Sequence, residues 1–240
     1  MRAGNPLLSE KNFQVRSQTS DVMTVGGTIN KTMILLCLCS ISAYYTWFSP
    51  QAANWIFPAA IGGLVLALIT IFKKEWSAYT SPLYAVVEGV VLGAISALYE
   101  ASMPGIVIQA ISLTFATLAL MLFLYRYNYI RVTDKLRSGI MVATGAIMLV
   151  YLLSMVLGFF GMNIPMIHGS GPIGIGFSLL VVGIAAFNLL LDFDFIERAS
   201  RSQSAPQYME WFGAFSLMVT LIWLYLEILR LLSKIQGGRR

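Results

Sequence analysis

The run GAIMLVYLLSMVLGFF, residues 145–160, contains no charged residue. Such a run constrains the fold strongly, because a helix of about 20 mostly apolar residues crosses the roughly 30 Å hydrocarbon core of a bilayer. It also lacks the alternation of polar and apolar residues that is typical of strands in a membrane barrel. We expect seven helices of this kind, at about residues 32–48, 53–72, 82–100, 105–126, 138–160, 172–196 and 209–232.

The composition agrees with a membrane location. The chain is 58% hydrophobic and 11% charged, whereas an ordinary soluble domain carries about 25% charged residues. The predicted fold class is therefore all-α, a polytopic membrane protein with seven transmembrane helices. Residues 1–31 are polar and rich in Gly, Ser and Thr, and we interpret them as a cytoplasmic N-terminal tail. Residues 32–240 form the predicted seven-helix transmembrane domain.

Basic residues are distributed unevenly among the predicted loops. Twelve of the sixteen Lys and Arg residues lie before the first helix or after the second, fourth and sixth. Cytoplasmic loops carry an excess of Lys and Arg, so this side is predicted to be the cytoplasm. The net charge of +5 then needs no nucleic-acid partner. Four basic residues remain near the C-terminus, where either the earlier loops fix the topology or the last segment does not cross completely: Arg230, Lys234, Arg239 and Arg240.

Seven of the eleven acidic residues lie within or at the ends of the predicted spans. An acid at the centre of a membrane helix costs roughly 2.5–3.5 kcal/mol, so it usually faces the bundle interior and marks a function. From the rise of a helix, Glu88 lies about 9 Å and Asp192 about 8 Å from the cytoplasmic end. With Asp194 and Glu210, these acids are predicted to form an acidic cluster on the cytoplasmic side.

Asp192 and Asp194 cannot have the same role. Positions i and i+2 point about 200° apart on a helix. Asp192 shares a stripe with Asn188, Ala185 and Ser178, the small and polar face expected between membrane helices. Asp194 has Arg198 at i+4 and can pair with it. We therefore expect Asp192 to face the bundle and Asp194 to pair near the headgroups.

Four segments together resemble the Bax inhibitor-one family of transmembrane proteins, in particular its bacterial branch: SPLYAVVEGVVLGAIS, ATGAIMLVYLLSMVLGFFG, NLLLDFDFIE and EWFGAFSLMVTLIWLYLEILRLL. The resemblance implies a seven-helix fold with the C-terminal helix central, and a pH-sensitive calcium leak. It also implies that an aspartate late in the sixth helix, matched by Asp192, pairs with an acid in the seventh. Glu227 takes the second position if LYLE is matched to the family's Leu-Tyr-Leu-Asp, and Thr220 takes it if the helix is matched without a gap.

We therefore expect a pH-sensitive cation leak channel of a bacterial inner (plasma) membrane, with calcium as the cation and buried carboxylates as the gate. Burial disfavours the charged form of a carboxylate, and oxygen ligands suit hard cations such as calcium. The alternative is a non-conducting protein that binds or modulates another membrane complex. An enzyme is not expected, because His168 is the only histidine and Cys37 and Cys39 point apart. We expect no cofactor and no metal centre; the expected partners are the bilayer, the cation and a membrane protein.

The loop charges predict seven crossings, with the N-terminus in the cytoplasm and the C-terminus outside. A reporter that works only in the cytoplasm should be inactive when fused after Arg240, and active when inserted after Arg131 in the loop between the fourth and fifth spans. Strong activity of the C-terminal fusion would show that the last segment does not cross.

Overall fold

The computed structural model describes residues 22–49, 51–160, 169 and 171–238. In this part of the chain, seven α-helices are long and apolar enough to cross a membrane, which confirms the all-α class. A short 3-10 helix, η3 (Lys74–Trp76), precedes the third of them. The seven are α2 (Val25–Trp47), α3 (Ala52–Phe72), α4 (Ser77–Ser102), α5 (Ile106–Arg126), α6 (Asp134–Phe159), α8 (Pro172–Arg201) and α9 (Met209–Gly237).

The first helix begins earlier than the apolar pattern indicated. It starts at Val25 rather than near residue 32, because Thr24 caps it: the Thr24 hydroxyl accepts a hydrogen bond from the Gly27 amide at 2.9 Å. A capping threonine satisfies one of the free amides in the first turn of a helix. Residues 25–31, which the sequence analysis assigned to the tail, therefore belong to the helix, and residues 1–21 lie outside the described residues.

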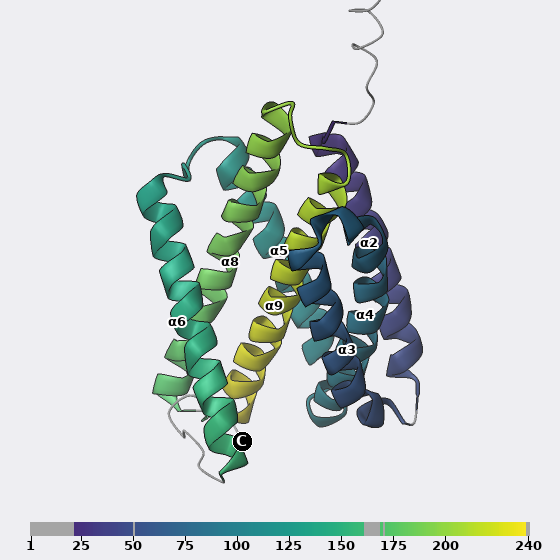
Figure 1. The fold of residues 1–240 in the computed structure, drawn as a ribbon. Helices are drawn as coiled ribbons and strands as arrows, with labels where there is room; N and C mark the ends of the chain where they lie inside the picture. Colours follow the sequence, from purple (N-terminus) through teal and green to yellow (C-terminus); the bar gives the residue numbers. More distant parts are fainter. Residues whose placement is uncertain (1–21, 50, 161–168, 170, 239–240) are drawn as a thin grey trace, which may run out of the picture.

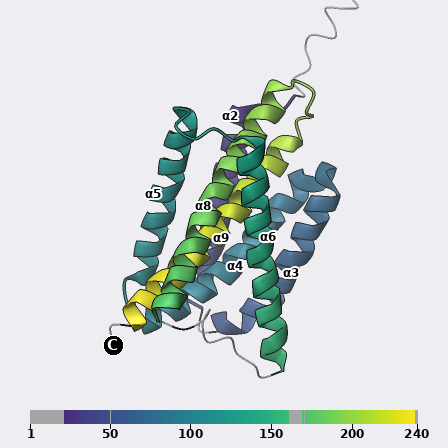
Figure 2. The same cartoon turned by 90° about the vertical axis from the view of Figure 1, so that its left-hand side faces the viewer.

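Helix α9 occupies the centre of the bundle, as the family resemblance implied. It packs against α2, α4, α5 and α8, and Figures 1 and 2 show it passing between them. Helix α3 lies outside α4, and α6 lies outside α8. The sequence of α9 explains its place, because fully buried apolar side chains occur along most of its length: Ala214, Met218, Leu224 and Leu229.

The helix connections separate into two ends. The amide of Met23, just before α2, donates to the carbonyl of Ala205 at 2.9 Å, so the start of α2 meets the turn between α8 and α9. The connections from α3 to α4 and from α5 to α6 lie toward the same end, and α9 finishes at the opposite end (Figure 1). The basic loops of the described chain thus gather at one end of the bundle; the membrane side that this end faces stays a prediction.

Two glycines let α2 and α4 approach closely. A Cβ atom added at Gly93 would overlap the carbonyl oxygen of Ala43 and lie 2.8 Å from its Cα, and one added at Gly89 would overlap the carbonyl oxygen of Cys39. Small residues four positions apart are typical of close contacts between membrane helices. Gly89 and Gly93 therefore join α4 to α2 by backbone contact.

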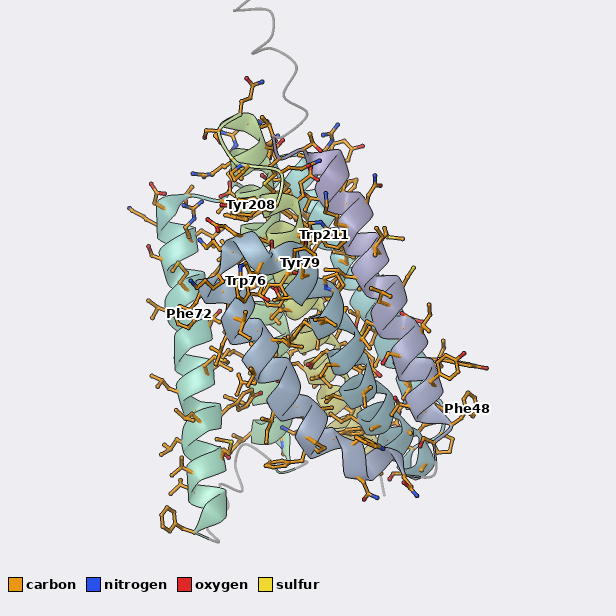
Figure 3. All side chains as sticks on the ribbon, turned by 45° about the vertical axis from the view of Figure 1, so that its right-hand side comes forward. Phe48, Phe72, Trp76, Tyr79, Tyr208 and Trp211 are labelled. Atoms are coloured by element: carbon orange, nitrogen blue, oxygen red, sulfur yellow. The ribbon has the colours of Figure 1, made fainter. Side chains whose placement is uncertain are left out.

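Exposed aromatic side chains mark both ends of the bundle. In Figure 3, Phe72, Trp76 and Tyr79 lie around the turn between α3 and α4, and Phe48 lies where α2 ends. All four are more than half exposed. Tryptophan and tyrosine are enriched where a membrane meets water, so Trp76 and Tyr79 fit an interfacial layer at the turn between α3 and α4.

Substituting Gly93 by Ala should destabilise the protein. The added methyl group meets backbone atoms that cannot rotate away, and overpacking of this kind costs about 1–3 kcal/mol. Thermal unfolding in detergent should show a clear fall in the midpoint. Gly145→Ala in α6 is the control, because a Cβ there meets nothing within 4 Å. Equal midpoints for the two variants would contradict the close contact between α2 and α4.

Candidate functional site

Asp192 lies where α8 meets the central helix. Pro172 begins α8, whose buried stripe includes Ser178, Ala185 and Asp192. The Asp192 side chain faces α9, where the Ser216 hydroxyl donates to its Oδ1 at 2.6 Å. Its second oxygen, Oδ2, is buried and has no hydrogen-bond partner among the described residues. The expected inward orientation of Asp192 is thus observed.

Thr220 is the second polar neighbour of Asp192. It lies one turn after Ser216 on α9, is buried, and its hydroxyl donates to the Ser216 carbonyl at 3.2 Å. The same hydroxyl is close enough to interact with the Asp192 carboxyl group. Of the two residues that the sequence offered as the partner on the seventh helix, Thr220 therefore lies beside Asp192, and Glu227 lies two turns farther along α9.

Asp194 has different partners. Arg198 donates from Nε to its Oδ1 at 2.8 Å, which confirms the expected i,i+4 pair. Arg137 of α6 also forms an ion pair with its Oδ2, and the Asp194 side chain is buried. Both carboxylate oxygens are therefore occupied by guanidinium groups. Sequence reasoning did not find Arg137, which lies 57 residues away.

The other two acids of the expected cluster, Glu210 and Glu88, do not lie beside Asp192. Glu210 accepts from the Thr24 hydroxyl at 2.7 Å and from Lys31, and so joins α9 to the start of α2. Glu88 is half-buried between α4 and α3, and its Oε2 lies 2.8 Å from the place that a Cβ on Gly63 would occupy. Each acid thus has its own set of neighbours.

Glu88 and Asp192 lie against different helices, Glu88 against α3 and Asp192 against α9. Tyr84, one turn before Glu88, packs its ring against Phe215 with centroids 5.0 Å apart. Asp192 contacts Ser216, the next residue of α9. Consecutive residues of a helix point about 100° apart, so Tyr84 and Asp192 approach α9 from different directions. The described contacts do not bring Glu88 and Asp192 together, and their common layer stays a prediction.

Glu227 forms a second polar centre, toward the C-terminal end of α9. Its side chain is almost completely buried, and its Oε1 accepts from Tyr151 Oη at 2.9 Å and Arg230 Nη1 at 2.8 Å. Arg230 Nη1 also lies 2.8 Å from Tyr151 Oη, which closes a triangle of contacts. One turn farther, Lys234 donates to the hydroxyl of Ser178 on α8 at 2.8 Å.

Helix α6 is joined to this polar interior by residues spaced seven apart. Arg137 pairs with Asp194, the Thr144 hydroxyl accepts from Asn188 at 2.8 Å, and Tyr151 reaches Glu227. Residues seven apart lie on one face of a helix. We call Arg137, Thr144 and Tyr151 the α6 polar face. The spacing of seven could have indicated this face from the sequence. Thr144 and Tyr151, however, lie in an apolar run, where a single threonine or tyrosine does not by itself predict a polar contact.

A mostly apolar cavity lies on another side of the central helix. It has a volume of about 410 Å³ and lies among α2, α4, α5 and α9, where Leu36, Trp47, Leu92 and Phe115 contribute to its wall. Its lining is mostly apolar, so it does not provide a route for a cation.

The described residues contain no group of three or more His, Cys, Asp and Glu side chains that could hold a metal ion. Cys37 is exposed and Cys39 is buried, as expected for residues that point apart. His168 lies outside the described residues.

Seven apolar helices with buried carboxylates along a central helix define a polytopic helical membrane protein with a partly polar interior. A family model described as Bax inhibitor 1 like matches residues 5–237. Because the match covers nearly the whole chain, the protein belongs to the Bax inhibitor 1 like family. No curated protein shows significant similarity to the chain.

Arg137→Gln should loosen α6. The substitution removes one contact of the α6 polar face, and few buried apolar side chains of the described part of α6 can replace it: Ile140 and Ile147. Hydrogen exchange followed by mass spectrometry in detergent should show faster exchange in α6 and unchanged exchange in α4. Lys135→Gln, an exposed position two residues earlier, is the control. Identical exchange in the two variants would show that the Arg137–Asp194 pair does not hold the helix.

Proposed function

We propose that this protein conducts calcium across the membrane as a pH-sensitive leak, with Asp192 in its gate. The observation that carries the proposal is the Asp192 carboxyl group, which is buried beside the central helix; one oxygen accepts from Ser216, and the other has no hydrogen-bond partner among the described residues. Membership of the Bax inhibitor 1 like family supports a membrane function of this class.

The unpartnered oxygen gives Asp192 two possible states. A buried polar atom without a hydrogen bond indicates a bound proton, water or ion. Protonated, the carboxyl group is neutral and compatible with its apolar neighbours. Ionised, it needs a counter-charge, because an unpaired charge is costly in a low-dielectric interior. A hard cation such as calcium, which takes oxygen ligands, satisfies that need. Ser216 and Thr220 supply hydroxyl oxygens beside it.

Asp194 contributes less to the gate in this proposal. Its two oxygens are already paired with Arg137 and Arg198, so its charge is balanced without a permeant ion. Glu210 is likewise paired, with Lys31. Glu88 has no cationic partner among the described contacts, and helix geometry predicts it at about the depth of Asp192. We assign Glu88 to the walls of the cytoplasmic half of the pathway.

The proposed location is a bacterial inner membrane with the N-terminus in the cytoplasm. The basic loops gather at the end of the bundle where α2 begins, and this end would meet the anionic headgroups of the cytoplasmic leaflet. The bilayer and the permeant cation are the partners that this function requires.

Asp192→Asn should remove most of the pH dependence of calcium flux. Asparagine keeps the size and the hydrogen bond to Ser216 but cannot change its charge. The measurement is calcium entry into dye-loaded liposomes that contain purified protein, from about pH 5 to pH 8, the interval in which a perturbed carboxyl group can change its charge. Asp194→Asn is the matched control and should change the profile less.

Two results would contradict the proposal. If wild-type protein gives no flux above empty liposomes at any pH in this interval, the protein does not conduct calcium, and a protein that modulates another membrane complex becomes the better explanation. If Asp192→Asn keeps the wild-type pH profile, the leak exists but Asp192 does not gate it.

A further inference from the structure

Glu227 has a buried carboxylate group, and its neighbours form hydrogen bonds with only one of its two oxygens. The exposed fraction of its side chain is 2%. Both donors, Tyr151 Oη and Arg230 Nη1, approach the same oxygen, Oε1. The second oxygen, Oε2, is buried and has no hydrogen-bond partner among the described residues. A carboxylate has about four lone-pair positions, so Glu227 retains capacity for another ligand.

The contact between Arg230 and Glu227 is not the strongest that the two groups can make. Arginine and a carboxylate commonly form two parallel hydrogen bonds, one to each oxygen. Here a single nitrogen, Nη1, is shared between Glu227 Oε1 and Tyr151 Oη, and the guanidinium carbon lies 5.1 Å from the centre of the Tyr151 ring. Arg230 therefore neutralises Glu227 without occupying both of its oxygens.

Arg230 also has space into which it can move. Its side chain is 37% exposed, and it lines a cavity of about 480 Å³ between the C-terminal ends of α4 and α9. Ser102 and Ser233 contribute polar groups to the same cavity. The guanidinium group thus belongs both to the buried ion pair and to the wall of a polar cavity, whereas the Glu227 carboxylate is enclosed.

We propose that Glu227 is a cation-binding carboxylate and that the Arg230 guanidinium occupies its site as a tethered counter-ion when the pathway is closed. The cation is of the hard, oxygen-binding class, and calcium is the example in the leak proposed above, on which this inference rests. When Arg230 moves into the cavity, Glu227 and the Tyr151 hydroxyl are left to bind the cation. Tyr151 is a positioning residue in this arrangement, because it holds Arg230 and Glu227 together.

The position of Glu227 on α9 fits a second binding position along the same route. Ser216, Thr220 and Glu227 follow one another on one stripe of the helix, and Thr220 lies beside Asp192. The seven residues from Thr220 to Glu227 correspond to about 10 Å along the helix axis. A cation that leaves Asp192 would therefore meet the next buried carboxylate about two turns farther, toward the opposite end of the bundle.

Lys234 adds a positive charge near this position. Its amino group is held by α8, where it donates to the Gly174 carbonyl at 3.1 Å and to the Ser178 hydroxyl at 2.8 Å. In the closed state, Lys234 and Arg230 together oppose the entry of a cation. Removing the Arg230 charge should therefore open the site in two ways, by freeing Glu227 and by lowering the repulsion, and a test must separate these two effects.

The test is a pair of substitutions measured alone and together. Arg230→Gln should raise calcium flux severalfold in vesicles of phosphatidylethanolamine and phosphatidylglycerol, because Glu227 is no longer occupied. Glu227→Gln combined with Arg230→Gln should abolish that gain, and this neutral pair avoids leaving either charge buried alone. If the gain survives in the double variant, Arg230 acts as a general repulsive charge, and the proposed site at Glu227 is wrong.

Matched variants control for charge and for structure. Glu100→Gln combined with Arg230→Gln removes another acid at the same end of the bundle, where Glu100 caps the start of α5 through the Val107 amide at 3.2 Å; it should keep the gain. Arg230→Lys retains the charge and should leave flux near the wild-type level. Tyr151→Phe keeps the ring but removes the hydroxyl group, and it should raise flux less than Arg230→Gln does.

A binding measurement separates failure of this inference from failure of the leak. Calcium chloride should raise the thermal midpoint of purified Arg230→Gln protein in detergent, and should raise it less in the double variant with Glu227→Gln. If wild-type liposomes are silent but this difference in midpoint is present, the leak proposal fails and the cation site stands. If calcium shifts both variants equally, Glu227 is not a cation site.

Discussion

The absence of water from the hydrocarbon core is the constraint on which the interior of this protein depends. A polar group buried there must find its partner within the bundle, because lipid offers none. Most of the acids in the described helices obey this rule: Asp194 has two guanidinium partners and Glu210 has Lys31 and Thr24. In Asp192 and Glu227, one carboxylate oxygen accepts a hydrogen bond, and the other has no hydrogen-bond partner among the described residues. Among the buried acids of the described helices, these two carboxylates are therefore places where a proton, water or cation can bind without breaking the apolar packing.

The same constraint explains how α6 is attached. Helices in lipid gain little from apolar contact with one another, since lipid tails are equally apolar, so close packing and hydrogen bonds decide their association. Helices α2 and α4 use close packing through Gly89 and Gly93, whereas α6 uses Arg137, Thr144 and Tyr151. Polar ties can exchange partners with a proton or an ion, but a backbone contact between glycine and a neighbouring helix cannot. The attachment of α6 therefore depends on the charge state of the interior more than the glycine contact between α2 and α4 does.

Much of this arrangement could be predicted from the sequence. The apolar runs specified seven helices, the i,i+2 spacing turned Asp192 and Asp194 to different neighbours, and Arg198 at i+4 identified one partner of Asp194. Contacts between distant segments could not be obtained in this way. Nothing local to Asp194 indicates Arg137, and nothing local to Glu227 indicates Tyr151, because these pairs depend on which helices become neighbours and how each is rotated. Helix depth likewise predicted Glu88 level with Asp192, but depth alone could not show that Glu88 lies against α3 and Asp192 against α9.

The end of α9 shows how the packing alters the interpretation of the loop charges. Four basic residues near the C-terminus seemed to conflict with a last helix that leaves the cytoplasm, since positive charges favour the cytoplasmic side. Arg230 is paired with Glu227, and the Lys234 amino group is bound to Gly174 and Ser178 of α8. These two residues are components of the bundle rather than charges of a loop. The excess of positive charge beyond the last helix is smaller than the sequence count suggests, and a full crossing of α9 agrees better with the charge rule than the sequence alone indicated.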